Sequence, residues 1–227
     1  MSPKTAFAAI LTLSASTALA ASIVNSKHDL AASSAAGVRN TQTTQICVFC
    51  HTPHNPARPA PLWNRLPPDR DPGTYVLYRE SETLSLAARA ARMTSASASM
   101  LCLSCHDGTL AEIGSRIRYA PVGGTLPLPM IDTYGSWGTS GVLWDGACVA
   151  NHPVGLDYAS AQAERPARLR TVAEVTAAFG TGVFYAGPNG ATSMECNTCH
   201  ATHDPAYPPF LRKSNANNAL CLACHVR

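Results

Sequence analysis

One five-residue unit of cysteine and histidine recurs along this sequence. Cys-x-x-Cys-His occurs as CVFCH, CLSCH, CNTCH and CLACH, and these copies use all but one of the nine cysteines. Two thiols with this spacing can add to the two vinyl groups on one edge of a porphyrin, and the next histidine can then give an imidazole nitrogen to the iron. The pattern therefore predicts four covalently bound haem c groups.

The repeated unit assigns a role to each of its members. The thioether bonds are expected at Cys47, Cys50, Cys102, Cys105, Cys196, Cys199, Cys221 and Cys224. The proximal iron ligands are expected at His51, His106, His200 and His225. Pairs of cysteines also occur in zinc sites and, in exported proteins, in disulfides. Neither alternative gives a reason for a histidine after every pair.

Four histidines remain outside the units, and four irons would each take a second axial ligand. These histidines are His28, His54, His152 and His203, so the eight histidines of the chain suffice for two per iron. The sequence thus predicts bis-histidine ligation, with these four as the distal ligands. The alternatives are ordinary surface histidines, or methionine ligation, which would raise the reduction potential. The candidate methionines are Met93, Met100, Met130 and Met194.

The position of His54 limits what it can bind. It follows His51 by three residues, and His203 follows His200 by the same interval. Axial ligands approach an iron from opposite faces of the ring, and two residues this close cannot straddle a porphyrin attached to the same loop. His54 must therefore ligate a different haem or none. A histidine shared in this way would hold neighbouring haems close together, as fast electron transfer requires.

Residues 1–21 have the pattern of a secretory signal peptide. Lys4 precedes an apolar run that ends in Ala18-Leu19-Ala20, a cleavage site of the A-x-A type. The run is too short and too rich in alanine for a stable membrane span, and no later segment is apolar enough to cross a bilayer. We therefore expect an exported protein without a transmembrane segment. The net charge of +3 gives no basic patch that would indicate nucleic-acid binding.

The segments between the units contain few strong signals of regular structure. Residues 22–45 form a polar arm that contains His28. Such terminal segments are usually disordered unless they bond to the rest of the protein, as a bond from His28 to an iron would allow. Residues 55–75 are rich in proline, which indicates an extended loop. Residues 81–101 contain good helix formers and lead into the second unit, which predicts a helix there.

The clearest helix is predicted within residues 164–180. Apolar side chains at helical spacing are Leu169, Val172, Val175, Ala178 and Phe179. Thr171 and Glu174 fit a capping box at its start, and Gly180 fits a stop signal. The apolar face of this helix is expected to pack in the core rather than to bind a ligand.

We expect an irregular fold, mostly coil with a few short helices and minimal strand, organised by the haem groups. Residues 22–227 would form a single tetrahaem cytochrome domain, with 22–45 as its N-terminal arm. The ninth cysteine, Cys148, lies outside the units. It is expected to be a small buried side chain, with redox activity or intermolecular pairing as the alternatives.

Several segments resemble a known family, the doubled-CxxCH multihaem cytochromes. The segments are SKHDL, CVFCHTPHN followed by APLWNR, LCLSCHDG, NHPVG, and ECNTCHATH with FLRKSN and LCLACH. In particular, the chain resembles the tetrahaem extracellular cytochrome filament proteins of outer-membrane cytochrome E type. The resemblance covers most of the chain after residue 21 and is weak in residues 107–147 and 156–190. It implies a fold with little secondary structure.

The resemblance also implies an assembly and a function. In that family, protomers stack head to tail, their haems form one continuous chain, and a histidine of one subunit ligates a haem in the next. The motif match gives this role to His54, with His28 as the alternative. The implied protein is an extracellular homopolymer that passes electrons to partner cytochromes or extracellular acceptors. The competing functions are a monomeric periplasmic electron shuttle and a small multihaem reductase with one open iron.

Overall fold

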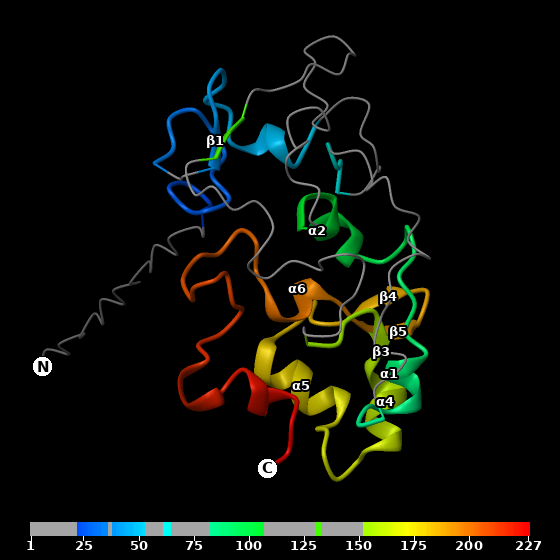
Figure 1. Ribbon diagram of the computed structural model, residues 1–227. Coiled ribbons are helices and arrows are strands. Elements are labelled where there is room, and N and C mark those ends of the chain that lie inside the picture. Colours follow the sequence, from blue (N-terminus) through cyan, green and yellow to red (C-terminus); the bar gives the residue numbers. More distant parts are fainter. Residues whose placement is uncertain (1–21, 36–37, 53–60, 65–81, 107–129, 133–151) are drawn as a thin grey trace, which may run out of the picture.

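The computed structural model (Figure 1) describes six stretches of the chain, which include seven of the eight histidines. The described residues are 22–35, 38–52, 61–64, 82–106, 130–132 and 152–227. The predicted signal peptide, His54, Cys148 and most of residues 107–147 lie outside them, and Met130 is described by its backbone alone.

Short elements separated by irregular chain make up the described part, as the sequence predicted. The helices are α1 (Leu86–Arg89), α2 (Ser99–His106), α4 (Tyr158–Glu164), α5 (Val172–Phe179) and α6 (Cys196–Cys199), with 3-10 turns at Cys47–Phe49, Ala216–Asn218 and Cys221–Ala223. The strands are β1 (Val38–Asn40), β2 (Met130–Asp132), β3 (Leu156–Asp157), β4 (Tyr185–Gly187) and β5 (Gly190–Met194). The expected fold class, mostly coil with few short helices and minimal strand, is confirmed. In the described part, no helix is both long and apolar enough to cross a membrane.

Two small antiparallel sheets join segments that are distant in the sequence. β1 pairs with β2, with Arg39 opposite Ile131. The second sheet has the order β3-β5-β4, so β5 lies in its centre, and Leu156 stands opposite Met194. In Figure 1 the N-terminal segments lie at one end of the molecule, α4 and α5 at the other, and α2 and α6 between them. The central position of β5 matters because the third Cys-x-x-Cys-His unit follows it directly.

The larger apolar core lies among α1, α2, α4, α5 and the three-stranded sheet. Its buried members include Leu103, Leu156, Tyr158 and Val175, and Cys224 of the fourth unit lies among them. A second, small cluster consists of Ala31 and of Phe49 from the first unit, and Val48 and Cys50 of the same unit pack against it. The units therefore pack against ordinary apolar cores and are not isolated loops.

The structure confirms the predicted capping signals around α5. The side chain of Thr171 accepts a hydrogen bond from the backbone of Glu174, and the Glu174 carboxylate accepts one from the backbone N–H of Thr171 at 2.8 Å. The helix ends before Gly180, whose φ of 89° suits glycine. Val175 is fully buried, as expected of the core-facing side. The helix begins only after Thr171. The earlier helix α4 ends at Glu164, and residues 165–171 between the two are turn and irregular chain.

The single helix predicted over residues 81–101 is wrong. The structure has α1 and the start of α2 there, separated by turns. Side chains in the break bond to nearby backbone, since Thr94 N donates to Ser97 Oγ at 3.0 Å and Ala96 N donates to Thr94 Oγ1 at 3.2 Å. Such local bonds compete with the helical ladder. The side chain of Asn189 also bonds to the backbone of Arg92.

Gly190, at the start of β5, offers a test of this architecture. Its φ is +134°, and a Cβ there would stand 2.7 Å from Oδ1 of Asp157. We expect Gly190→Ala to lower the free energy of unfolding by about 1–3 kcal/mol through backbone strain and this collision. Gly182→Ala is the matched control, since Gly182 has φ of +72° but no atom within 4 Å of its Cβ position. Thermal denaturation showing no greater loss in Gly190→Ala than in the control would contradict the described β3–β5 packing.

Candidate functional site

Each Cys-x-x-Cys-His unit lies on one tight helical turn. His51 N donates to Cys47 O at 2.8 Å, His200 N donates to Cys196 O at 3.1 Å, and His225 N donates to Cys221 O at 2.9 Å. The second unit forms the C-terminal part of α2. Residues three apart on such a turn face the same side. The turn therefore presents both thiols together, which is what attachment to one porphyrin edge requires.

The histidine rings meet in three pairs of equal spacing. The ring centroids lie 6.1 Å apart in each pair, with interplanar angles of 56°, 23° and 72°. The pairs are His28 with His106, His51 with His203, and His152 with His225. Each pair joins the histidine of one unit to a histidine outside the units. The sequence could not assign these partners.

The spacing of the pairs fits a shared metal atom. A ligating imidazole nitrogen stands about 2 Å from a metal ion and about 1.1 Å from its own ring centroid, so two axial imidazoles have centroids about 6 Å apart. Directly stacked rings would be closer, as His28 and Phe210 are, at 4.4 Å. The residues present therefore fit an iron with two axial histidines at three of the four units.

Backbone carbonyls lie within hydrogen-bond distance of the Nδ1 atoms of three described histidine rings. The Nδ1 atoms of His51, His152 and His200 lie 2.8, 3.0 and 3.0 Å from the carbonyl oxygens of Pro61, Pro153 and Pro209. A carbonyl only accepts, so Nδ1 carries the proton and Nε2 keeps its lone pair. This arrangement orients the ring and leaves Nε2 for a metal.

Burial keeps two of the paired histidines neutral. Desolvation, helped by nearby His106, lowers the pKa of His28 from 6.5 to about 4. Burial, and then the neighbouring His152, lowers the pKa of His225 below its usual value. Only a neutral imidazole can ligate iron. Both side chains are therefore in the ligating form at neutral pH.

Among the described histidines, His200 is the one that lies in no such ring pair. Its Nδ1 lies near the carbonyl oxygen of Pro209, as the Nδ1 atoms of His51 and His152 lie near proline carbonyls. Its unit also has the same backbone turn as the others. The predicted distal histidine that lies outside the described residues is His54.

Trp63 and Asn64 support the first unit. The Trp63 ring meets His51 edge to face at 5.8 Å, and its Nε1 donates to Ser104 Oγ of the second unit at 3.2 Å. Asn64 is fully buried and donates from Nδ2 to Val48 O. Neither residue was predicted as part of the site, although both belong to the APLWNR segment. Trp63 thus connects the first unit to the second, and Asn64 supports the first.

Thiols of different units also lie side by side. A hydrogen bond with the Cys196 thiol, and then burial, raises the pKa of Cys102 well above its usual value. Burial, and then the charges of neighbouring thiols, raise the pKa of Cys199 to about 11 and that of Cys224 to about 12. In the third unit, Cys196 thus lies beside the second unit and Cys199 lies beside the fourth.

Disulfides and zinc sites are the alternatives for the cysteines of the described part. Its eight cysteines are all free thiols. No group of three or more His, Cys, Asp or Glu side chains there is close enough to hold a metal ion by itself. The observed two-histidine pairs match axial ligation of a porphyrin metal better than a tetrahedral zinc site.

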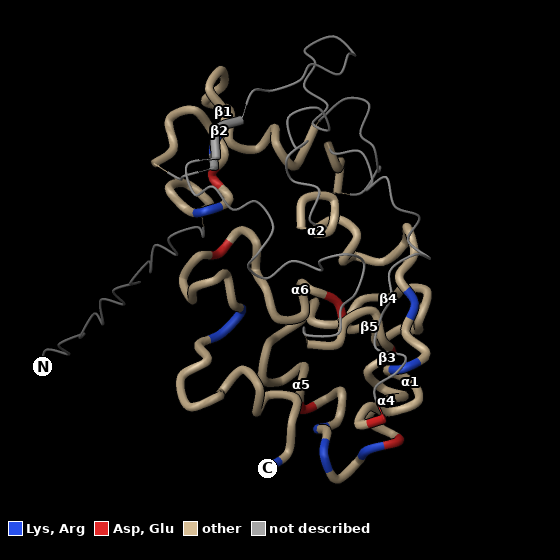
Figure 2. Tube along the Cα trace, in the orientation of Figure 1, with Lys and Arg blue, Asp and Glu red and all other residues tan. Residues whose placement is uncertain are grey.

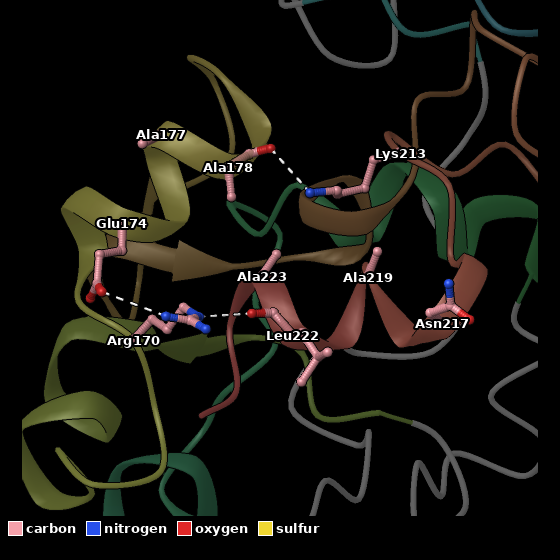
Figure 3. Close-up of a pocket in the computed structure, with 9 residues that line it drawn as sticks. All are labelled: Arg170, Glu174, Ala177, Ala178, Lys213, Asn217, Ala219, Leu222 and Ala223. Carbon is pink, nitrogen blue, oxygen red and sulfur yellow. Dashed lines mark hydrogen bonds and ion pairs between the residues drawn. The ribbon is translucent and has the colours of Figure 1, made fainter. Parts of the chain in front are cut away.

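A surface hollow of about 500 Å³ lies between α5 and the C-terminal segment (Figure 3). Arg170 Nε donates to Leu222 O at 2.8 Å and its guanidinium lies 3.7 Å from the Glu174 carboxylate. Lys213 Nζ donates to Ala178 O at 3.5 Å. Both cations thus have protein partners, and Arg170 links Glu174 of α5 to Leu222 of the fourth unit. Figure 2 shows that positive and negative residues mix along the described trace.

Comparison with known proteins supports the haem interpretation at the C-terminal end. Residues 189–227 match a family model described as the doubled CXXCH motif, and they contain the third and fourth units. No match was found among curated proteins. CXXCH units of this kind bind c-type haem covalently. The doubled motif therefore supports a multihaem c-type cytochrome that transfers electrons.

Proposed function

We propose that this chain is a tetrahaem c-type cytochrome that conducts electrons through bis-histidine haems, polymerised as an extracellular filament. The observation that carries the proposal is the three histidine pairs at 6.1 Å. Each haem would supply a one-electron ferric/ferrous couple. The residues supply attachment, axial ligation and orientation, which is the protein's part in such chemistry.

The ring pairs suggest a ligand assignment. The first unit would take His51 and His203, the second His106 and His28, and the fourth His225 and His152. The third unit then has His200 as its proximal ligand. With eight histidines in the chain, the distal ligand left for it is His54. The same loop would carry His200 and His203 as ligands of two different haems and hold those haems as neighbours.

This assignment bears on assembly. Three irons obtain both ligands from the described part of one chain, so the remaining ligand is the candidate for exchange between subunits. His54 donated to the third unit of a neighbour would make a heterologous contact, which propagates as a filament when it does not close. His28, the alternative donor, lies against His106 of its own chain. We therefore retain His54 as the favoured donor.

The second candidate function is a monomeric electron shuttle in the periplasm. It is favoured by the same three pairs, because they close within one chain, and it requires only that His54 reach its own third unit. A reductase would require an iron with an open position. Both the filament and the shuttle rest on the export predicted from residues 1–21.

Negative-stain electron microscopy of the mature, haem-loaded protein separates the two candidates. The filament proposal expects thin fibres with a regular repeat, and discrete small particles at every concentration would overturn it in favour of the shuttle. The mass of the intact chain, measured by mass spectrometry on the same sample, should correspond to four covalent haems. A mass that corresponds to three or fewer haems would overturn the tetrahaem count.

A further inference from the structure

Glu195 is a buried carboxylate at the junction of two haem-attachment units. It is 1% exposed and lies between β5 and α6, directly before Cys196. Acidic side chains are almost never fully buried unless they are paired. In the described part of the chain, Glu195 forms no ion pair with a lysine or arginine. Its burial therefore calls for a specific role.

Hydroxyl and amide donors surround this carboxylate. Oε2 accepts from Ser99 N at 3.1 Å and from Ser99 Oγ at 2.5 Å, and Oε1 accepts from Ser193 Oγ at 2.7 Å. All three donors are neutral, so they satisfy the oxygens without cancelling the charge. The negative charge of the ionised side chain thus remains uncompensated in a site of low dielectric constant, where its field is strong.

The hydrogen bonds span both units. Ser99 is the first residue of α2, which carries Cys102, and its Oγ also accepts from Cys196 N at 3.0 Å. Glu195 N donates to Thr198 Oγ1 at 2.9 Å inside the third unit. One side chain therefore connects the start of α2 to the start of α6. The bond to Cys196, burial, and the charges of Cys196 and Cys105 raise the pKa of the Cys102 thiol, and the charge of Glu195 raises it as well, so Glu195 and Cys102 lie close together.

We propose that Glu195 is a positioning residue that fixes the second and third haem-attachment units to each other and lowers the reduction potentials of both haems by its charge. The inference rests on haem c at these two units, as in the proposed function, and does not require polymerisation. A negative charge nearby favours the ferric over the ferrous iron, because reduction removes a positive charge from its field. A purely structural cap would hold α6 in place without this effect on the potentials.

Glu195→Gln tests the electrostatic part with little change of shape. Glutamine can accept from Ser99 through its amide oxygen and donate to Ser193 through its amide nitrogen, so the bonds can be kept while the charge is lost. We expect two of the four haems to become easier to reduce, each by roughly tenfold in its ferric/ferrous equilibrium constant, or about 59 mV for one electron. Haem content and the low-spin spectrum should not change.

The measurement is a spectroelectrochemical titration of the haem-loaded protein, with haem-methyl NMR signals assigning each potential to its unit. Glu82→Gln is the matched control, since Glu82 is exposed and the change in net charge is identical. It should leave all four potentials in place. Potentials of Glu195→Gln that match the wild type, or that shift equally at all four haems, would overturn the proposal.

A second variant covers failure of Glu195→Gln to mature. Ser193→Ala removes one donor from Oε1 and retains the carboxylate. With one hydroxyl dipole fewer directed at it, the carboxylate should at pH 8 lower the potentials of the same two haems further. Unchanged or higher potentials in this variant would overturn the proposal. Loss of filaments in either variant would not bear on it, because the potentials are read within one chain.

Discussion

His28→Ala is expected to convert one of the four irons from a low-spin, six-coordinate state to a high-spin state that binds carbon monoxide. His28 lies opposite His106, with ring centroids at 6.1 Å, and burial keeps it neutral. Alanine would leave the iron of the second unit with one axial ligand. Reduced wild-type protein should bind no carbon monoxide, and the variant should bind one molecule per chain with a rate set by access to the open position.

The matched control is Lys27→Ala, which changes the adjacent residue of the same arm and keeps the ligand. It should behave as the wild type in the carbon monoxide difference spectrum. His152→Ala should also open one iron, that of the fourth unit, because His152 faces His225 at the same spacing. Stoichiometric binding to the wild type, or none to His28→Ala, would contradict the bis-histidine assignment.

His54→Ala is expected to abolish or shorten the filaments and leave all four haems covalently attached. The thioether bonds depend on the cysteines, which this change does not touch. If His54 of one subunit ligates the third unit of the next, its loss removes the strongest contact between them. The iron held by His200 should then become high-spin and bind one carbon monoxide per chain.

His28→Ala provides the comparison for this variant. Both variants open one iron, but only His54→Ala should change the length of the particles under the electron microscope. Filaments of unchanged length in His54→Ala would remove His54 from the subunit contact. Equal loss of filaments in both variants would mean that any open iron disrupts assembly, and would count against a specific bridging role.

The chemistry of the sites could be predicted from the sequence because it is local. Two thiols and one imidazole within five residues predict each attachment unit, and the helical turn that presents them spans the same five residues. The start and end of α5 were also predicted, since the side chains of Thr171 and Glu174 bond to each other and to neighbouring backbone. Interactions between residues this close in the sequence depend little on the rest of the fold.

The helix expected over residues 81–101 shows where local preference is insufficient. Its residues favour a helix, but Ser97 and Thr94 bond to nearby backbone and Asn189 bonds to Arg92. The last of these partners is far away in the sequence. Propensity is a weak preference that a few such bonds can override. The break therefore results from local side-chain bonds together with one tertiary contact, and the sequence pattern alone did not reveal it.

The sequence by itself determined which residues can attach haem and how many histidines can serve as ligands. Only the tertiary structure decided which distal histidine faces which unit, because His28 and His106, or His51 and His203, meet through the packing of chain segments that no local pattern relates. The same holds for Glu195, whose role depends on Ser99 being brought to it from α2. Attachment is a property of five consecutive residues, whereas ligand pairing and the electrostatic surroundings of each haem are properties of the folded chain.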